Sequence, residues 1–250
     1  MHCIIHHNDG YIMTQLALDG PTVHTTYYGR NTEQMPKLFA EGKEPMNIAH
    51  LMEQRLAVRE KGVSQVQHDA WWNNYFDNAD LSLRHPDKGV KVIPYSAQVL
   101  DFLRGYVKPE TKLVNNAVPL PDGLFEAMEG LVLTPRQVEQ LHTRGYTPKE
   151  AKESKFWQTV AQSQKRLNKY VDAVVAETGR EQDLMKIYFS PVSIVPTGRL
   201  WFVNNRGNVS YANGSINLTY DNGRLVGVAP EAHVSSVLRE ARARKSRSES

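Results

Sequence analysis

The chain has 250 residues and a formal net charge of +3, and 40% of its residues are hydrophobic. This composition supports a folded core and excludes a globally disordered chain. No window reaches the roughly 18 apolar residues of a membrane-spanning helix, and the N-terminus lacks the pattern of a secretory signal. One cysteine, Cys3, excludes an internal disulfide framework and multi-cysteine zinc sites. We therefore expect a cytoplasmic protein with one large domain or two small ones.

Basic residues are concentrated towards the C-terminus. Residues 186–250 contain nine Lys and Arg against four Asp and Glu. A positive segment of this kind suits a polyanionic partner, and a solvated basic tail accounts for the same excess. Charge alone therefore leaves nucleic-acid binding open.

The first part of the chain mixes loops, short strands and helices. Gly and Pro punctuate its first 45 positions. Apolar residues at helical spacing predict a helix from Asn47 to about Gly62. Further patterns predict a strand over 90–93 and a helix over 97–106. The aromatic cluster at 71–76 is expected to belong to the core, with base stacking as the alternative.

Two threonine motifs predict helix starts in the central part of the chain. Thr134 and Thr147 are each followed by Pro and, three residues on, by Gln or Glu, which is the pattern of a capping box. A turn at Gly145 and a stop at Gly179 complete a predicted pair of helices. Residues 134–178 also have a helix-turn-helix outline, which would suit a DNA-binding accessory or regulatory protein.

Short apolar and aromatic runs separated by Asn, Gly and Pro turns follow Gly179. The runs cover residues 184–189, 192–195, 200–203, 209–211, 216–220 and 225–228. They predict a C-terminal antiparallel β-meander with a basic tail, after a helical N-terminal and central part, in an α+β fold. The expected domains are an N-terminal mixed domain (1–130), a helical pair (131–180), a β-rich region (181–237) and a basic tail (238–250).

Four possible metal ligands crowd the N-terminus: His2, Cys3, His6 and His7. Ligands this close in one extended stretch do not all converge on one ion, so surface histidines are the expected role. The sequence also contains no nucleophile elbow, phosphate-binding Gly-Lys-Thr loop or zinc-protease helix. No self-sufficient catalytic set is therefore predicted.

The segment 189–227 carries a more specific pattern. In order, it contains Gly198-Arg199, Leu200-Trp201, residues 204–208 (NNRGN) and residues 223–227 (GRLVG). This order resembles the single-subunit RNA polymerases of phages and mitochondria, in which a Gly-Arg strand-turn lies beside the template–RNA hybrid. The sequence departs from that family at Val195, where the family has an acidic residue or threonine.

The resemblance implies a set of nucleic-acid-binding residues, with Arg199 on a backbone phosphate. The set is Gly198, Arg199, Arg206, Gly207, Asn208, Lys165 and Arg166. The family's catalytic aspartates and its nucleotide-binding helix have no match here, so the resemblance implies a nucleotidyltransferase subunit that is inactive alone. A larger catalytic polymerase subunit would hold Mg²⁺, and this chain would hold no metal, cofactor or catalytic residue.

The leading hypothesis is therefore the small subunit of a heterodimeric phage DNA-directed RNA polymerase. It would act in the host cell cytoplasm on a DNA template and an RNA–DNA hybrid, without a membrane partner. Two alternatives stay open: a DNA-binding accessory protein that uses residues 134–178, and a structural virion protein whose Asn- and Gly-rich strands only support the fold.

Overall fold

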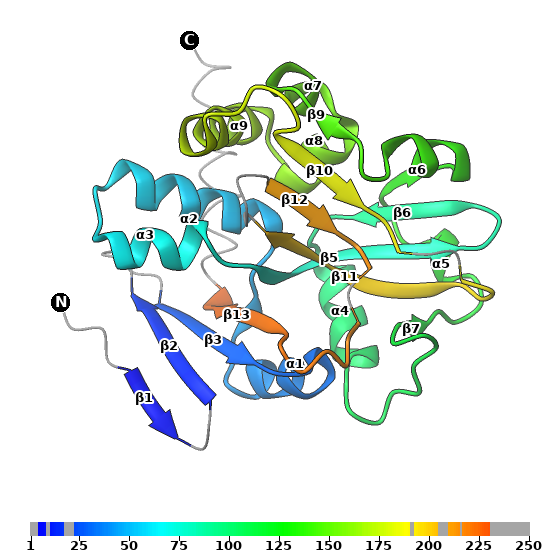
Figure 1. Ribbon diagram of the computed structural model, residues 1–250. Helices are drawn as coiled ribbons and strands as arrows, with labels where there is room; N and C mark the ends of the chain where they lie inside the picture. The colour runs from blue at the N-terminus through cyan, green and yellow to red at the C-terminus, as the bar shows by residue number, and fades with distance from the viewer. Residues whose placement is uncertain are drawn as a thin grey trace, which may run out of the picture.

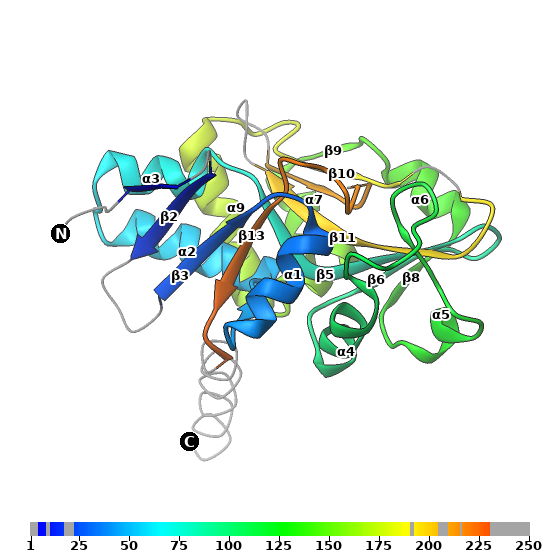
Figure 2. The same ribbon diagram turned by 90° about the horizontal axis from the view of Figure 1, so that it is seen from below.

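The computed structural model of the protein describes residues 5–8, 11–17, 23–190, 193–204, 210–215 and 217–230. In these residues, helices lie on both faces of one large mixed sheet (Figures 1 and 2). This architecture confirms the predicted α+β class. No helix in this part of the chain is long and apolar enough to cross a membrane.

The strands of the described residues join segments that are far apart in the sequence. They are β1 (Ile5–Asn8), β2 (Tyr11–Ala17), β3 (Val23–Tyr28), β4 (Glu44–Pro45), β5 (Phe76–His85), β6 (Gly89–Ile93), β7 (Val118–Pro119), β8 (Leu131–Leu133), β9 (Gly145–Tyr146), β10 (Met185–Tyr188), β11 (Thr197–Asn204), β12 (Ser210–Asn213) and β13 (Arg224–Val228). Their order is β1-β2-β3-β13-β5-β11-β12-β10-β9, and β4, β6, β7 and β8 pair off this path. Strands from 1–130 and 181–237 therefore share one sheet.

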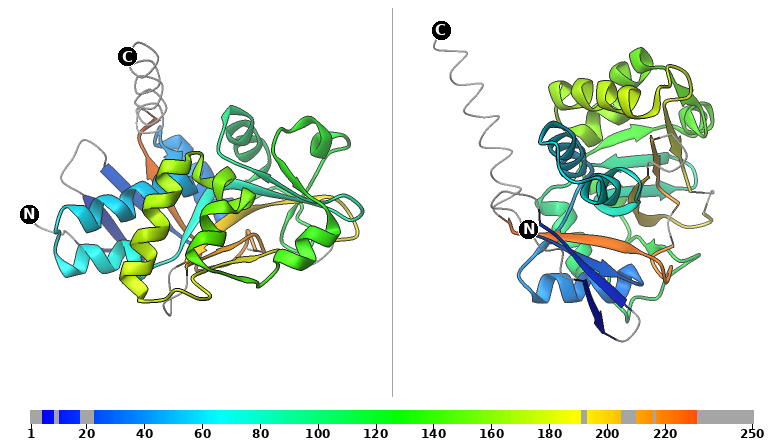
Figure 3. Two further views of the ribbon diagram at one scale, coloured as in Figure 1. Left: turned by 90° about the horizontal axis from the view of Figure 1, so that it is seen from above. Right: turned by 60° about the vertical axis from the view of Figure 1, so that its left-hand side comes forward.

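The helices surround this sheet in two groups. They are α1 (Asn31–Ala40), α2 (Ile48–Glu60), α3 (Gln65–Trp72), α4 (Ala97–Tyr106), α5 (Leu124–Ala127), α6 (Pro135–Leu141), α7 (Pro148–Glu153), α8 (Lys155–Ala161) and α9 (Gln164–Thr178). Figure 3 shows α2, α3, α8 and α9 gathered on one face of the sheet, while Figure 2 shows α1, α4 and α5 on the other.

Each helix group encloses its own hydrophobic core. The larger core joins α2, α3, α8 and α9 to the sheet and includes Trp71, Trp157 and Trp201. The smaller core joins α1, α4 and α5 to the opposite face and includes Leu38 and Phe102. The central strands β5 and β11 are therefore buried on both faces over much of their length.

The C-terminal strands do not form the predicted antiparallel meander. β10 pairs in parallel with β12, β11 pairs with β5, and β13 pairs with β3. The described residues of the predicted strands 192–195 and 216–220 are turns and bends. The physical reason is burial: every residue of β13 is buried, and β3 and β5 from the N-terminal half supply partners on its two sides.

Residues 135–178 form four helices where the sequence predicts a pair. The capping boxes at Thr134 and Thr147 are confirmed, each with both reciprocal hydrogen bonds. However, the side chains of Ser154 and Ser163 cap the first turns of α8 and α9. Because serine offers the backbone such a cap, each one interrupts the long helix that apolar spacing alone predicts.

Several N-terminal predictions are confirmed. The side chain of Asn47 caps α2, and both α4 and β6 lie where the sequence predicts them. Trp71, Trp72 and Phe76 are buried, as expected for a core cluster. Tyr75, by contrast, is only half-buried.

Candidate functional site

Four aromatic side chains form a row across neighbouring strands of the sheet. We define the aromatic row as Tyr75, next to β5, Phe202 on β11, Tyr211 on β12 and Tyr188 on β10. Ring centres lie 5.2 Å apart for Tyr75 and Phe202, 6.0 Å for Phe202 and Tyr211, and 5.2 Å for Tyr211 and Tyr188. All four side chains are half-buried. The ring of the exposed His142 continues the row, 6.0 Å from Tyr188.

Strand alternation explains why these aromatics are not in the core. Side chains on a strand point alternately to its two faces. Trp201, Val203 and Ala212 point into the larger core and are at most 2% exposed. Their neighbours Phe202 and Tyr211 therefore point to the opposite face of the sheet. The smaller core covers part of that face but does not extend over β10, β12 and the end of β11. In Figure 1 these three strands lie side by side.

Polar side chains border the row. The Asn204 amide donates a hydrogen bond to the Tyr211 hydroxyl at 2.7 Å. In register, Lys186 lies beside Tyr211 and Asn213 lies between Phe202 and Tyr188. Aromatic rings with one polar end and adjacent amides form a surface that can contact apolar and polar groups together.

Arg199 anchors the loop that borders the row. Its guanidinium donates to the backbone carbonyls of Asn115, Asn116 and Ser215 and to the Asn217 side chain. The two carbonyls at 115–116 belong to the loop before β7, and the other two acceptors follow β12. Burial lowers the pKa of Arg199. The side chain is therefore a clamp between two loops, with its donors directed at protein oxygens.

Gly198 has an equally local role. A side chain at this position would meet the Phe102 ring at 2.9 Å and Leu120 and Leu83 at 3.2 Å. The close packing of α4 against β11 therefore requires glycine here. Close packing at Gly198 and loop anchoring by Arg199 therefore account for the Gly-Arg pattern.

Asp77 anchors the far end of the same loop. One of its carboxylate oxygens accepts the backbone N–H of Arg224 at 2.8 Å. Burial raises the pKa of Asp77 to about 7, although the hydrogen bonds from Arg224 and Asn31 oppose the rise. Asp80, three residues further along β5, is held similarly: it accepts the backbone N–H groups of Ile48 and Tyr95, and burial raises its pKa to about 7.

Of the other predicted nucleic-acid-binding residues, only Lys165 and Arg166 lie in the described part of the chain. Arg166 is half-buried and pairs with Glu53 through Nε at 2.9 Å, which ties α9 to α2. Lys165 is exposed on α9. Arg206, Gly207 and Asn208 lie outside the described residues.

The predicted metal ligands are only partly within the described chain. His2 and Cys3 lie outside the described residues, and His6 and His7 belong to β1, where only the backbone is described. Among the described residues, no group of three or more His, Cys, Asp or Glu could hold a metal ion.

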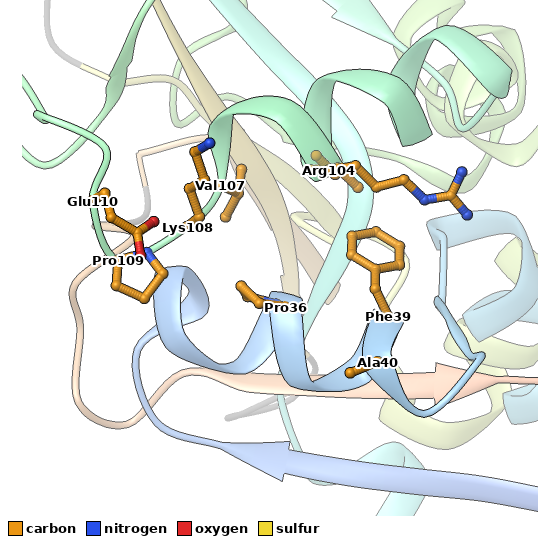
Figure 4. A pocket seen from close by; sticks show the side chains of 9 residues that line it. Pro36, Phe39, Ala40, Arg104, Val107, Lys108, Pro109 and Glu110 are labelled. Carbon is orange, nitrogen blue, oxygen red and sulfur yellow. The ribbon is translucent and has the colours of Figure 1, made fainter.

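A shallow groove of about 490 Å³ between α1 and α4 is the other surface feature of note (Figure 4). Its floor is apolar, with Pro36, Phe39 and Val107, and Arg104 lies over the Phe39 ring at 5.1 Å. In Figure 4 Arg104 and Glu110 lie at opposite ends of the groove. Because its polar groups do not converge, the groove is a weaker candidate than the aromatic row.

Comparisons with known proteins identify the fold. No family model matches this chain, and no curated protein matches it. It is similar to a solved structure described as "Accommodation of massive sequence variation in Nanoarchaeota by the C-type lectin fold". The TM-score is 0.61 at 13% identity, and the match covers 84% of this chain and 98% of the other. This chain therefore has the C-type lectin fold.

The fold overturns the predicted relationship to RNA polymerases. The resemblance over 189–227 is wrong, and with it the transcription function and its expected subunit arrangement. The pattern that suggested it has a structural cause, because Gly198 is required by packing and Arg199 by the two loops it joins. The segment 134–178, which has a helix-turn-helix outline in the sequence, contains four capped helices instead of two.

The aromatic row was missed because its members are spread over 137 positions, from 75 to 211. One local signal could have pointed to it. Of the twenty residues 204–223, six are Asn, three Gly, two Ser and two Tyr. This composition is typical of recognition loops on rigid scaffolds as well as of turns.

Proposed function

We propose that this protein is a recognition protein that binds a partner protein through the aromatic row. The observation that carries the proposal is the row itself: four half-buried aromatic side chains, each in contact with the next, on a part of the sheet that neither core covers. Aromatic residues are enriched at protein interfaces, because they bury a large area at a low cost in side-chain entropy.

The way in which the row is supported favours recognition over a purely structural role. The strands beneath it are fixed by the larger core, and the loop beside it is anchored at Arg199 and Asp77. Rigid support of this kind lowers the entropy that a binding surface loses when it engages a partner. Contacts made by the row therefore contribute more fully to affinity.

The structural neighbour supports the same proposal. Its description states that the C-type lectin fold accommodates massive sequence variation in Nanoarchaeota. In this chain, Tyr188, Phe202 and Tyr211 can change without opening a cavity in either core, because none of them belongs to the larger or the smaller core. A surface that tolerates substitution on a fixed scaffold suits the recognition of different partners.

A triple variant tests this proposal. Tyr188→Ser, Phe202→Ser and Tyr211→Ser together remove the row, while Val66→Ser with Val132→Ser removes two exposed apolar side chains elsewhere. Full-length proteins are immobilised and exposed to extract from the source cells, and the affinity of each retained partner is then measured by titration. We expect the triple variant to weaken binding roughly a hundredfold or more, as for central interface aromatics, and the control to bind like the natural protein.

The opposite result is equally clear. If every protein retained by the natural chain is retained as well by the triple variant, the row is not the recognition surface. Near-ultraviolet circular dichroism of both variants checks that the fold is intact. If the natural chain retains glycans instead of proteins, and the triple variant does not, the proposed class of partner is wrong but the aromatic row is still the binding surface.

A further inference from the structure

A buried arginine on β5 stands apart from the other buried cations of the molecule. Arg84 is 7% exposed, and its Nε and Nη1 atoms are fully buried without a hydrogen-bond acceptor among the described residues. Burial lowers the pKa of Arg84, and no neighbouring charge contributes. An uncompensated guanidinium in this position is costly to fold, so its environment calls for an explanation.

Comparison with other buried arginines makes the exception clear. Arg55 donates to the carbonyls of Trp71 and Asn74 and to the Tyr170 hydroxyl, at 3.0, 3.1 and 2.7 Å. Arg199 donates to three carbonyls and an amide oxygen. In both, the protein's own oxygen atoms satisfy the guanidinium.

Arg224 shows a second way to hold a buried guanidinium. Its Nε is also without an acceptor, but the charged group lies over the Phe76 and Tyr28 rings, at 4.9 and 5.1 Å from their centres. Attraction to ring faces offsets part of the burial cost. Among the described residues, Arg84 has neither a set of acceptors nor an aromatic ring beneath it.

The surroundings of Arg84 combine polar side chains with Val90 of β6, its other cross-strand neighbour, and are open at one point. In register, Arg84 lies opposite Thr197 on β11, and Ser82 is the next residue of β5 on the same face. The Ser82 hydroxyl is likewise buried without a partner among the described residues. The third guanidinium nitrogen, Nη2, is not among these fully buried atoms. Because Nη2 is bonded to the same carbon as Nε and Nη1, an anion that reaches it along one edge of the planar group can also accept from one of these two nitrogens.

We propose that Arg84 is the anchor of a carboxylate-binding subsite at this end of β5 and β11. A carboxylate supplies two acceptor oxygens and one negative charge, which match a single planar guanidinium. A phosphate dianion would leave one negative charge uncompensated in a buried site, which disfavours it. The subsite lies on the face of the sheet opposite the aromatic row, so this proposal is independent of the proposed function.

The test uses the full chain labelled with ¹⁵N-arginine. The Nε–H signal of Arg84 is assigned by its loss in Arg84→Lys and is followed during titration with acetate at constant ionic strength, with inorganic phosphate and chloride as comparison anions. We expect a saturable shift with acetate and a weaker response to the other two anions. An unchanged Arg84 signal, or equal responses to all three anions, would overturn the proposal.

Thermal stability gives a second readout with matched variants. Acetate should raise the melting temperature of the natural protein and of Arg104→Met, which removes an exposed cation, but not that of Arg84→Met. A rise of the same size in Arg84→Met would mean a general salt effect and would refute the subsite. If Arg84→Met does not fold, the signal of the natural chain still decides the question.

A blocked glutamate peptide distinguishes the two sources of carboxylate. Acetyl-Gly-Glu-Gly-amide carries one side-chain carboxylate, whereas acetate represents a free small acid. Binding of the peptide roughly tenfold tighter than acetate, a difference within the range of a few added contacts, assigns the subsite to a partner's side chain. Equal or weaker peptide binding assigns it to a small carboxylic acid, and both results require Arg84.

Discussion

The two faces of β10, β11 and β12 differ sharply although they belong to the same strands. The inner face presents side chains such as Trp201 and Ile187, which are fully buried against α8 and α9. The outer face presents Phe202, Tyr211 and Tyr188, which touch one another and remain half-exposed. The contrast teaches that one face supplies stability and the other is free to supply recognition.

The largest expected effect is a difference in unfolding free energy between a substitution on the inner face and one on the outer face. Trp201→Ala should lower the free energy of unfolding by about 3–5 kcal/mol, because it opens a cavity in the larger core. Tyr211→Ser on the outer face should change it by no more than about 1 kcal/mol. Urea unfolding of both variants measures the difference. Equal losses would mean that the outer face is also a core, and the comparison would fail.

The loop anchor at Asp77 predicts a pH dependence. The folded pKa of Asp77 is about 7, above its usual value of 3.8, so its contribution to stability is complete below about pH 4 and is lost as pH rises towards 7. Asp77→Asn keeps an acceptor for the Arg224 N–H and removes this loss. Between pH 4 and 8, the unfolding free energy of the variant should therefore gain roughly 2–4 kcal/mol relative to the natural protein.

Urea unfolding at several pH values measures this difference. A gap between the two proteins that stays constant across the range would show that the Asp77 carboxyl titrates as an ordinary exposed group. Glu33→Gln, which changes an exposed carboxylate on α1, serves as the matched control and should leave the pH profile unchanged.

Removing the Arg199 clamp should lower the stability of the protein by an intermediate amount. Arg199→Met leaves the carbonyls of Asn115 and Ser215 without their donor and removes one of the two donors of the Asn116 carbonyl, which should cost about 2–3 kcal/mol. Arg199→Lys should restore little, since one ammonium group cannot reproduce the planar fork. Denaturant unfolding tests both, and a stability equal to that of the natural protein in either variant would contradict the clamp.

The smallest effect concerns a region remote from both faces. Thr147→Ala removes a helix cap that is present with both reciprocal hydrogen bonds and should cost about 1 kcal/mol. Thr134→Ala removes the equivalent cap of α6 and should cost a similar amount. Neither should alter partner binding, so a binding defect in Thr147→Ala would extend the recognition surface beyond the aromatic row.

Local physics made part of this fold predictable from the sequence. The Asn47 cap, the two capping boxes and the extent of α4 follow from short-range patterns, and the structure has each of them. Strand pairing was less predictable. β5, the main partner of β11, and β3, a partner of β13, each lie more than a hundred residues away. The turn signals between the C-terminal strands therefore predict a local meander, of which only the antiparallel β11–β12 pair forms.

The functional surface was still less predictable, for a related reason. The Gly198-Arg199 pair looked like a nucleic-acid contact because sequence alone does not show the loop carbonyls around Arg199. The aromatic row needs β5, β10, β11 and β12 to be placed side by side before its members meet. The Asn-, Gly-, Ser- and Tyr-rich segment is a local sequence signal of that surface.

Site-specific photocrosslinking tests the central claim most directly. A benzophenone amino acid replaces Tyr211 in the aromatic row or Val132, an exposed apolar residue on β8, and each protein is irradiated in the source cells. We predict a discrete crosslinked partner protein from position 211 and none from position 132. The same adducts from both positions, or adducts from position 132 alone, would contradict recognition through the aromatic row.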